Sequence, residues 1–200
     1  MRDVIVATED ILSEAVAEKL IQETGGRLQV VQKLGRQGFG YLKSRMLNFN
    51  QMARIQPVFV LTDLDRIECA TTLIEKWLGQ HRPAPGLLFR VAVREIESWL
   101  LADHEAMGIL LQRTQLRLPD APDALVDPKE TLVRLARTGP RAVREAIIPE
   151  PGAVASQGLG YNNILVDHVR NHWSPERAAS RSDSLSRARI KILKHAALAT

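Results

Sequence analysis

The sequence has one cysteine among its 200 residues, Cys69. A single thiol excludes an internal disulfide and any metal cluster built from several cysteines. No apolar run approaches the roughly 20 residues that a membrane-spanning helix needs. The first residues lead directly into strand-like sequence, so we expect no signal peptide and a cytoplasmic location. The hydrophobic content of 45% is ordinary for a globular protein.

Two common motifs of phosphate and zinc chemistry are also missing. The glycine-rich segment from Lys33 to Gly40 contains no Gly-Lys-Ser/Thr, so we expect no NTP-binding P-loop. The five histidines show no His-Glu-x-x-His spacing. His168 and His172 lie four residues apart, but no third ligand accompanies them, which argues against a metal at that pair.

The chain carries a net charge of +4, with 27 basic and 23 acidic residues. A phosphate-bearing partner is compatible with this charge without being required by it. Arg36, Lys43 and Arg45 surround the glycine-rich segment and the helix expected after it, and are candidates for binding a nucleic-acid backbone. An exposed polar helix face is the alternative. The basic C-terminus allows the same two interpretations.

Four apolar stretches have the length and composition of strands. They cover residues 3–7, 28–31, 57–61 and 87–93. Helical patterns follow them at about 12–24, 41–54 and 67–78, and an apolar stripe runs through 94–103. This alternation predicts an α/β fold with a four-strand parallel sheet and helices on both faces. The uninterrupted apolar run from Pro57 to Leu61 indicates a central strand.

No convincing strand follows residue 103. Helical patterns cover residues 129–137, 140–147, 161–173 and 185–198. We therefore expect an α/β core over residues 1–103 and a helical C-terminal extension over 104–200, packed on that core. The Gly158 to Asn163 segment reads as a helix-start loop, with completion of a site as the alternative.

Acidic residues follow three of the predicted strands. Because the carboxyl ends of parallel strands share one edge of the sheet, these acids can converge although they are far apart in sequence. A single acid in such a place is usually a helix cap, and a solvated turn with Asp65 capping the next helix is the alternative here. The three groups are Glu9, Asp10 and Glu14; Asp63 and Asp65; and Glu95 and Glu97.

Neighbouring carboxylates repel one another unless a proton or a cation lies between them. Hard divalent cations prefer such oxygen ligands, so the pattern favours Mg²⁺ or Mn²⁺ at this edge. Lys129 follows Asp127-Pro128 and is a candidate for neutralising charge on a phosphate. A solvated lysine in the first turn of a helix is the alternative.

The order of these motifs resembles the TOPRIM domain of topoisomerases, bacterial primases and OLD-type nucleases. Asp63 and Asp65 match its Asp-x-Asp motif, and Glu97, with Glu95 second, matches its later acid. The first motif departs from the usual Glu-Gly, because Asp10 stands in the place of the glycine. Either Glu9 is the first acid, or Asp10 is, with Glu14 four residues on. The segments 94–103 and 127–130 are also similar to small uncharacterised bacterial TOPRIM-like proteins.

The resemblance implies a TOPRIM/Rossmann-like sheet and a magnesium-dependent nuclease that hydrolyses phosphodiester bonds of DNA or RNA. It implies Glu9, Asp63, Asp65 and Glu97 as metal ligands, with Glu9 also catalytic and Glu14 as a candidate for a second metal or a base. Lys129, from its chemistry alone, is the other catalytic candidate. Some of the similar proteins lie near phage-defence genes, and this chain shows no motor, so we expect a partner protein such as an ATPase. A non-catalytic binding or regulatory subunit is the alternative. Response-regulator receivers, Asp-x-Asp phosphatases and metal-dependent glycosyltransferases fit this sequence less well.

Overall fold

The structure, a computed structural model, describes residues 1–198. Its strands are β1 (Arg2–Thr8), β2 (Leu28–Gly35), β3 (Val58–Asp63) and β4 (Leu87–Ala92). They form one parallel sheet in the order β2-β1-β3-β4. The predicted four-strand parallel α/β fold is confirmed, and β3 lies inside the sheet as its apolar sequence indicated.

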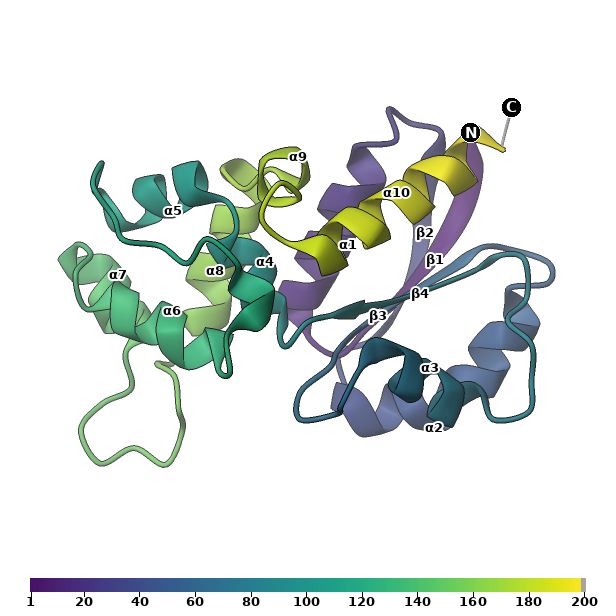
Figure 1. Cartoon of the computed structure of the whole chain (residues 1–200), viewed down its shortest axis with the longest axis horizontal. Coiled ribbons are helices and arrows are strands. Elements are labelled where there is room, and N and C mark those ends of the chain that lie inside the picture. Colours follow the sequence, from purple (N-terminus) through teal and green to yellow (C-terminus); the bar gives the residue numbers. More distant parts are fainter. Residues whose placement is uncertain (199–200) are drawn as a thin grey trace.

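Helices cover both faces of this sheet (Figure 1). One face packs against α1 (Ile11–Gln22) and α10 (Asp183–Ala197), and the other against α2 (Gly38–Met52) and α3 (Ala70–Leu78). Successive side chains of a strand point to opposite faces. Phe59 and Leu61 accordingly join the core with α1, whereas Val58 and Val60 join the core with α2 and α3. Two covered faces explain why β3 is apolar from Val58 to Leu61.

The remaining helices gather beside the sheet (Figure 1), and α10 then returns to cover its face. They are α4 (Ile96–Leu101), α5 (His104–Leu111), the 3-10 helix η1 (Pro122–Ala124), α6 (Pro128–Ala136), α7 (Arg141–Ile147), α8 (Tyr161–Asn171) and α9 (Pro175–Ala178). One hydrophobic core joins the sheet to these helices, with Val16 of α1 and Leu165 of α8 in the same cluster. None of the helices described is long and apolar enough to cross a membrane.

The helical character of the C-terminal extension is confirmed over the described residues, and residues 199–200 of the predicted 104–200 segment lie outside them. The division of the chain at residue 103 stays a prediction.

Several element boundaries differ from the sequence-based expectation. The segment 33–40 is not a single loop, because β2 continues to Gly35 and α2 begins at Gly38. Pairing of Gly35 with Thr8 of β1 extends the strand, which is a tertiary effect. The helix expected from residue 67 begins at Ala70, because Cys69 caps it. The short helices α5 and α9 were not predicted.

Candidate functional site

The carboxyl ends of β1, β3 and β4 meet at one edge of the sheet, because these three strands are neighbours. Glu9 follows β1, Asp63 is the last residue of β3, and Glu97 lies in the first turn of α4 after β4. The charges of Glu9, Glu97 and Asp65 all act on Asp63. The structure therefore brings these four sequence-predicted acids to the same place, which we call the acidic edge.

Glu9 bridges β1 to the end of β3. Its Oε1 accepts a short hydrogen bond from the Thr62 hydroxyl and a 3.0 Å bond from the Asp63 backbone N–H. Burial raises the pKa of Glu9 above its ordinary value, against the lowering effect of these two donors. The side chain is thus fixed at the edge by its neighbours, with a carboxyl group that takes up a proton more readily than in water.

Asp63 holds the centre of the acidic edge. Its Oδ1 is sealed from solvent and has no hydrogen-bond partner. Burial, followed by the negative charges of Glu97 and Glu9, raises the pKa of Asp63 well above its ordinary value. A buried carboxylate oxygen without a donor is costly, and a cation or a proton relieves that cost.

Glu97 is 2% exposed and receives two contacts from the C-terminal helices. Its Oε1 accepts a 2.7 Å hydrogen bond from the Tyr161 hydroxyl and lies 3.6 Å from Lys129 Nζ. Its Oε2 is buried without a partner. Burial raises the pKa of Glu97, although Lys129 and Tyr161 oppose that rise. Glu97 thus resembles Asp63 in carrying one unsatisfied oxygen.

Lys129 is a partly buried cation among these acids. Burial works to lower its pKa, but the charges of Glu97 and Glu95 outweigh burial and hold the pKa above its ordinary value. The charge of Asp63 acts on it as well. Lys129 therefore lies beside the acidic edge, and the neighbouring acids keep its side chain protonated.

Asp65 is exposed and lies just beyond β3 in a left-handed backbone conformation, with φ of 50°. It does not cap the next helix, because Cys69 takes that position. The backbone carbonyl of Arg94 accepts bonds of 2.9 Å from the N–H groups of Leu64 and Asp65. Arg94 in turn donates to the Asp65 carbonyl across 3.2 Å. These bonds tie the Asp-x-Asp turn to the segment that follows β4.

Two of the acids near the edge accept hydrogen bonds from backbone N–H groups in the first turn of a helix. Asp10 Oδ1 accepts a 2.7 Å bond from the backbone N–H of Ser13 and caps α1. Glu95 Oε2 accepts a 2.9 Å bond from the backbone N–H of Lys129 in the first turn of α6. Burial raises the pKa of Glu95. Of the two candidates in the first motif, Glu9 bonds to the end of β3 and Asp10 bonds within its own helix.

Glu14 is engaged elsewhere. It is 2% exposed, and its oxygens accept bonds of 2.8 and 2.5 Å from Arg36, with Lys33 Nζ at 3.2 Å. Burial favours a higher pKa for Glu14, but Arg36 and Lys33 outweigh it and leave the pKa below its ordinary value. Arg36 is therefore paired with an acid, while Lys43 and Arg45 are exposed on α2.

In residues 1–198, no three His, Cys, Asp or Glu side chains are already arranged to hold one metal ion. The oxygens of Asp63 and Glu97 that lack partners suit a hard cation by their chemistry. Glu9 and Glu97, however, each hold another donor. Each of them also keeps a second oxygen free of these donors, so binding an ion through three or more of the acids requires side chains to move, without the loss of these hydrogen bonds.

Two residues at the edge were not singled out from sequence. Thr62 directly precedes the Asp-x-Asp motif, and this position is the only feature of the sequence that could have indicated its contact with Glu9. Tyr161 belongs to the segment 158–163, for which completion of a site was one interpretation, but nothing local indicated that its hydroxyl reaches Glu97.

No protein-family model and no curated protein sequence matches this chain. Among solved structures, the chain is similar to the C-terminal region of the Burkholderia pseudomallei OLD protein. The two are 16% identical in sequence, the alignment covers 98% of each chain, and the TM-score is 0.45.

Proposed function

We propose that this protein is a metal-dependent hydrolase that cleaves phosphodiester bonds of nucleic acid. The observation that carries the proposal is the convergence of Glu9, Asp63 and Glu97 from three strand ends, with a buried, unpartnered oxygen on both Asp63 and Glu97. Burial and mutual repulsion make it unfavourable for these three carboxyl groups to be ionised together, and a bound divalent cation would offset this unfavourable free energy.

In this proposal Asp63, Asp65, Glu97 and Glu9 hold Mg²⁺ or Mn²⁺. A divalent ion held there would supply Lewis-acid chemistry for phosphodiester hydrolysis. Glu14 joins this set only if it leaves Arg36 and Lys33, to which both of its oxygens are bound.

The protein's own groups would hold charge and protons around the phosphate. Lys129 lies among Glu97, Glu95 and Asp63 and would neutralise negative charge that develops on the phosphate. Thr62 and Asp63 occupy Oε1 of Glu9, so Oε2 would serve in one of two roles. It would either hold the ion or, because the pKa of Glu9 is raised, accept the proton from the attacking water.

Lys43 and Arg45 would contact the nucleic-acid backbone, because both are exposed on α2. Arg36 would contribute more weakly, since its guanidinium is already bound to Glu14. Binding through lysine and arginine releases counterions, so affinity should fall as salt rises. The net charge of +4 is compatible with such a partner.

A second candidate is a non-catalytic binding or regulatory subunit, which would work with a partner protein such as an ATPase. One observation favours it: within residues 1–198 no three acids are already arranged around one ion. In this case the acids would bind metal weakly and turn over no substrate.

A cleavage assay separates the two candidates. Labelled single- and double-stranded DNA and RNA are incubated with wild type and Asp63→Asn, in Mg²⁺ and in Mn²⁺. Glu145→Gln, at an exposed site on α7, serves as the matched control. The hydrolase proposal expects metal-dependent cleavage by wild type and the control and its loss in Asp63→Asn. Equal cleavage, or none by any of the three proteins, favours the non-catalytic candidate.

A further inference from the structure

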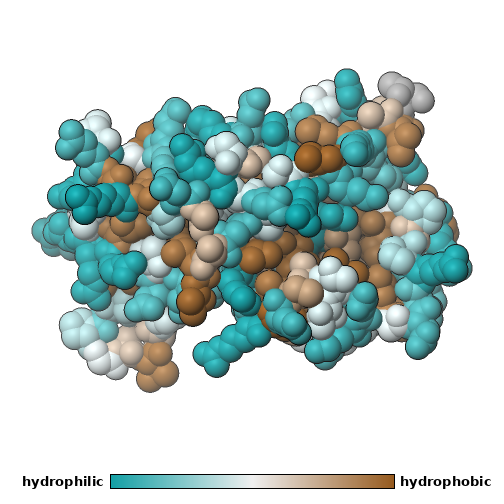
Figure 2. All heavy atoms as spheres, in the orientation of Figure 1, coloured by the Kyte–Doolittle hydropathy of each residue, from teal (hydrophilic) through white to brown (hydrophobic). Residues whose placement is uncertain are grey.

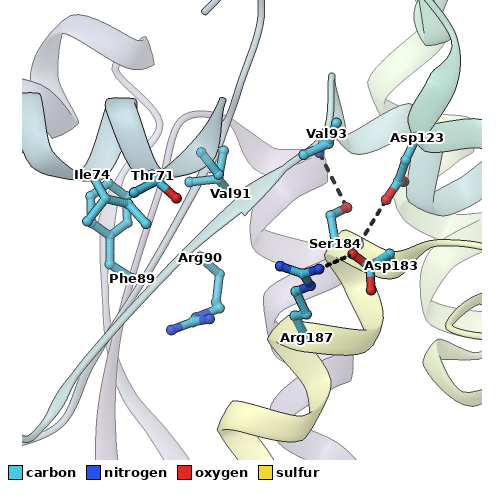
Figure 3. Close-up of a pocket in the computed structure, with 11 residues that line it drawn as sticks. Thr71, Ile74, Phe89, Arg90, Val91, Val93, Asp123, Asp183, Ser184 and Arg187 are labelled. Atoms are coloured by element: carbon cyan, nitrogen blue, oxygen red, sulfur yellow. Dashed lines mark hydrogen bonds and ion pairs between the residues drawn. The ribbon is translucent and has the colours of Figure 1, made fainter. Parts of the chain in front are cut away.

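A second candidate site lies away from the acidic edge, at the free edge of β4. A pocket of about 390 Å³ opens there between the first turns of α3 and α10 (Figure 3). None of the residues proposed to hold metal lines it. The lining residues used below are Ile74, Phe89, Arg90, Val91, Val93 and Arg187.

Arg90 is an unusual residue for its position on β4. Its neighbours on the same face of the strand, Leu88 and Ala92, are both fully buried in the hydrophobic core. Arg90 Nε is also sealed from solvent, and it has no hydrogen-bond partner. Burial alone acts on its pKa and lowers it, and no acid in the described part of the chain forms an ion pair with it. The buried Nε therefore bears a desolvation cost that no partner in the described part of the chain offsets, although the side chain as a whole is half-buried.

The other charged groups of the pocket already have partners. Asp183 and Arg187 pair with each other across 2.8 Å. Asp123 accepts a 2.7 Å bond from the Ser182 hydroxyl and a 2.8 Å bond from the Ser184 backbone N–H. Figure 3 shows Arg90 apart from these contacts, on the strand side of the pocket. An incoming anion would thus meet Arg90 as its available cation.

The remaining walls are mainly apolar. Ile74, Phe89, Val91 and Val93 contribute hydrocarbon surface. Figure 2 shows hydrophobic residues gathered in the hollow between α10 and α3. The opposite edge of the sheet differs, because β2 exposes Gln29, Gln32 and Lys33, which discourage contact with other molecules. On β4, the charged residue at the free edge is Arg90.

We propose that this pocket binds a small organic anion that lies across the free edge of β4, with a carboxylate or phosphate group on Arg90 at one face and a compact apolar body that reaches Phe89, Ile74 and Val91 at the other. The pocket volume lies within the range of about 300–1,000 Å³ that is typical of small-molecule sites, and one placed cation in apolar walls is their usual composition. A planar guanidinium binds both anionic groups through paired N–H donors. The proposal is independent of catalysis at the acidic edge.

Titration by two-dimensional NMR tests the site, with EDTA present so that no metal contributes. The probes are benzoate, phenyl phosphate and, as a neutral analogue, benzyl alcohol. Saturable shifts at the residues that line the pocket are expected with at least one anion, and weaker or no shifts with the alcohol. Arg90→Met should reduce the anion affinity by about tenfold or more, the loss expected for one charge-assisted hydrogen bond.

Two controls keep the test decisive. Arg134→Gln removes an exposed arginine on α6 and should leave the affinity unchanged. Circular dichroism spectra establish that Arg90→Met is folded, and Arg90→Lys, which keeps a cation, should retain part of the affinity if the first variant fails to fold. The proposal is overturned if neither anion causes saturable shifts at the pocket of wild type, or if the folded Arg90 variant binds them as wild type does.

Discussion

The hydroxyl of Tyr161 donates a 2.7 Å hydrogen bond to Oε1 of Glu97, although 64 residues separate them in sequence. Tyr161 begins α8, and Glu97 follows β4. Both are buried. Through this contact the C-terminal helices act directly on the electrostatics of the acidic edge. They are therefore part of the site as well as a cover for the sheet.

Replacing Tyr161 with phenylalanine should destabilise the fold. The variant keeps the ring but removes the donor from a buried carboxyl group, so the free energy of unfolding should fall by about 1–3 kcal/mol. Urea unfolding at pH 7 measures the change. Tyr41→Phe, at a part-buried site, should cost much less, and equal losses in the two variants would show that the contact with Glu97 contributes little.

Replacing Asp63 with asparagine should stabilise the metal-free protein at neutral pH. The pKa of Asp63 is higher in the folded chain than in the unfolded chain, through burial and the charges of Glu97 and Glu9. An acid of this kind lowers stability once the pH rises past its unfolded pKa, and the cost is complete above its folded pKa. The gain in Asp63→Asn should therefore shrink as the pH falls toward about 4, near the unfolded value. Denaturant unfolding of both proteins in EDTA, from neutral pH to about pH 4, measures this gain. An Asp63→Asn variant that is less stable than wild type at pH 7 would contradict the prediction.

Glu14 should show the opposite pH dependence. Burial alone would raise the pKa of Glu14, but Arg36 and Lys33 outweigh burial and leave the folded pKa below the unfolded one. The ion pairs of Glu14 therefore stabilise the protein above the unfolded pKa, and this stabilisation is lost as the pH falls through the folded pKa. Arg36→Gln should lower the free energy of unfolding at pH 7 by about 1–2 kcal/mol, less than for a fully buried pair because half of the Arg36 side chain is exposed. The loss should diminish in acid, and a pH-independent loss would point to packing instead.

Substitutions at Asp65 should separate backbone strain from loss of charge. Its φ of 50° is tolerated by aspartate, asparagine and glycine but costs alanine about 1 kcal/mol. Thermal unfolding should therefore rank Asp65→Ala as the least stable of the three variants, with Asp65→Asn and Asp65→Gly close to wild type. All three should lose the same contribution to metal binding. If Asp65→Ala is as stable as Asp65→Asn, the backbone strain is absent.

The parts of the site that follow from local sequence were predictable. Val58 to Leu61 form an apolar run that indicates a strand covered on both faces, and the acids that follow it then lie at the carboxyl end of that strand. Parallel topology then places Glu9 and Glu97 at the same edge. The boundaries of α3 and β2 were less predictable, because they depend on the Cys69 cap and on pairing with β1.

Contacts between distant segments were not accessible in this way. Glu9 and Glu14 were both predicted as metal ligands, yet one bonds to the end of β3 and the other pairs with Arg36, which directly follows β2. Arg90 reads as an ordinary strand residue until the packing of α10 over the sheet leaves its Nε buried and unpartnered. In each case the environment is created by the assembled fold, so no short stretch of sequence encodes it.

Whether the acidic edge binds a divalent cation is the central question, and calorimetric titration with Mg²⁺ and Mn²⁺ answers it most directly. Wild type and Glu145→Gln should bind saturably, whereas the double variant Asp63→Asn/Glu97→Gln should not, because it removes both carboxylates that have an unpartnered oxygen. Absence of binding by wild type, or equal binding by the double variant, would contradict the assignment of this edge as a metal site.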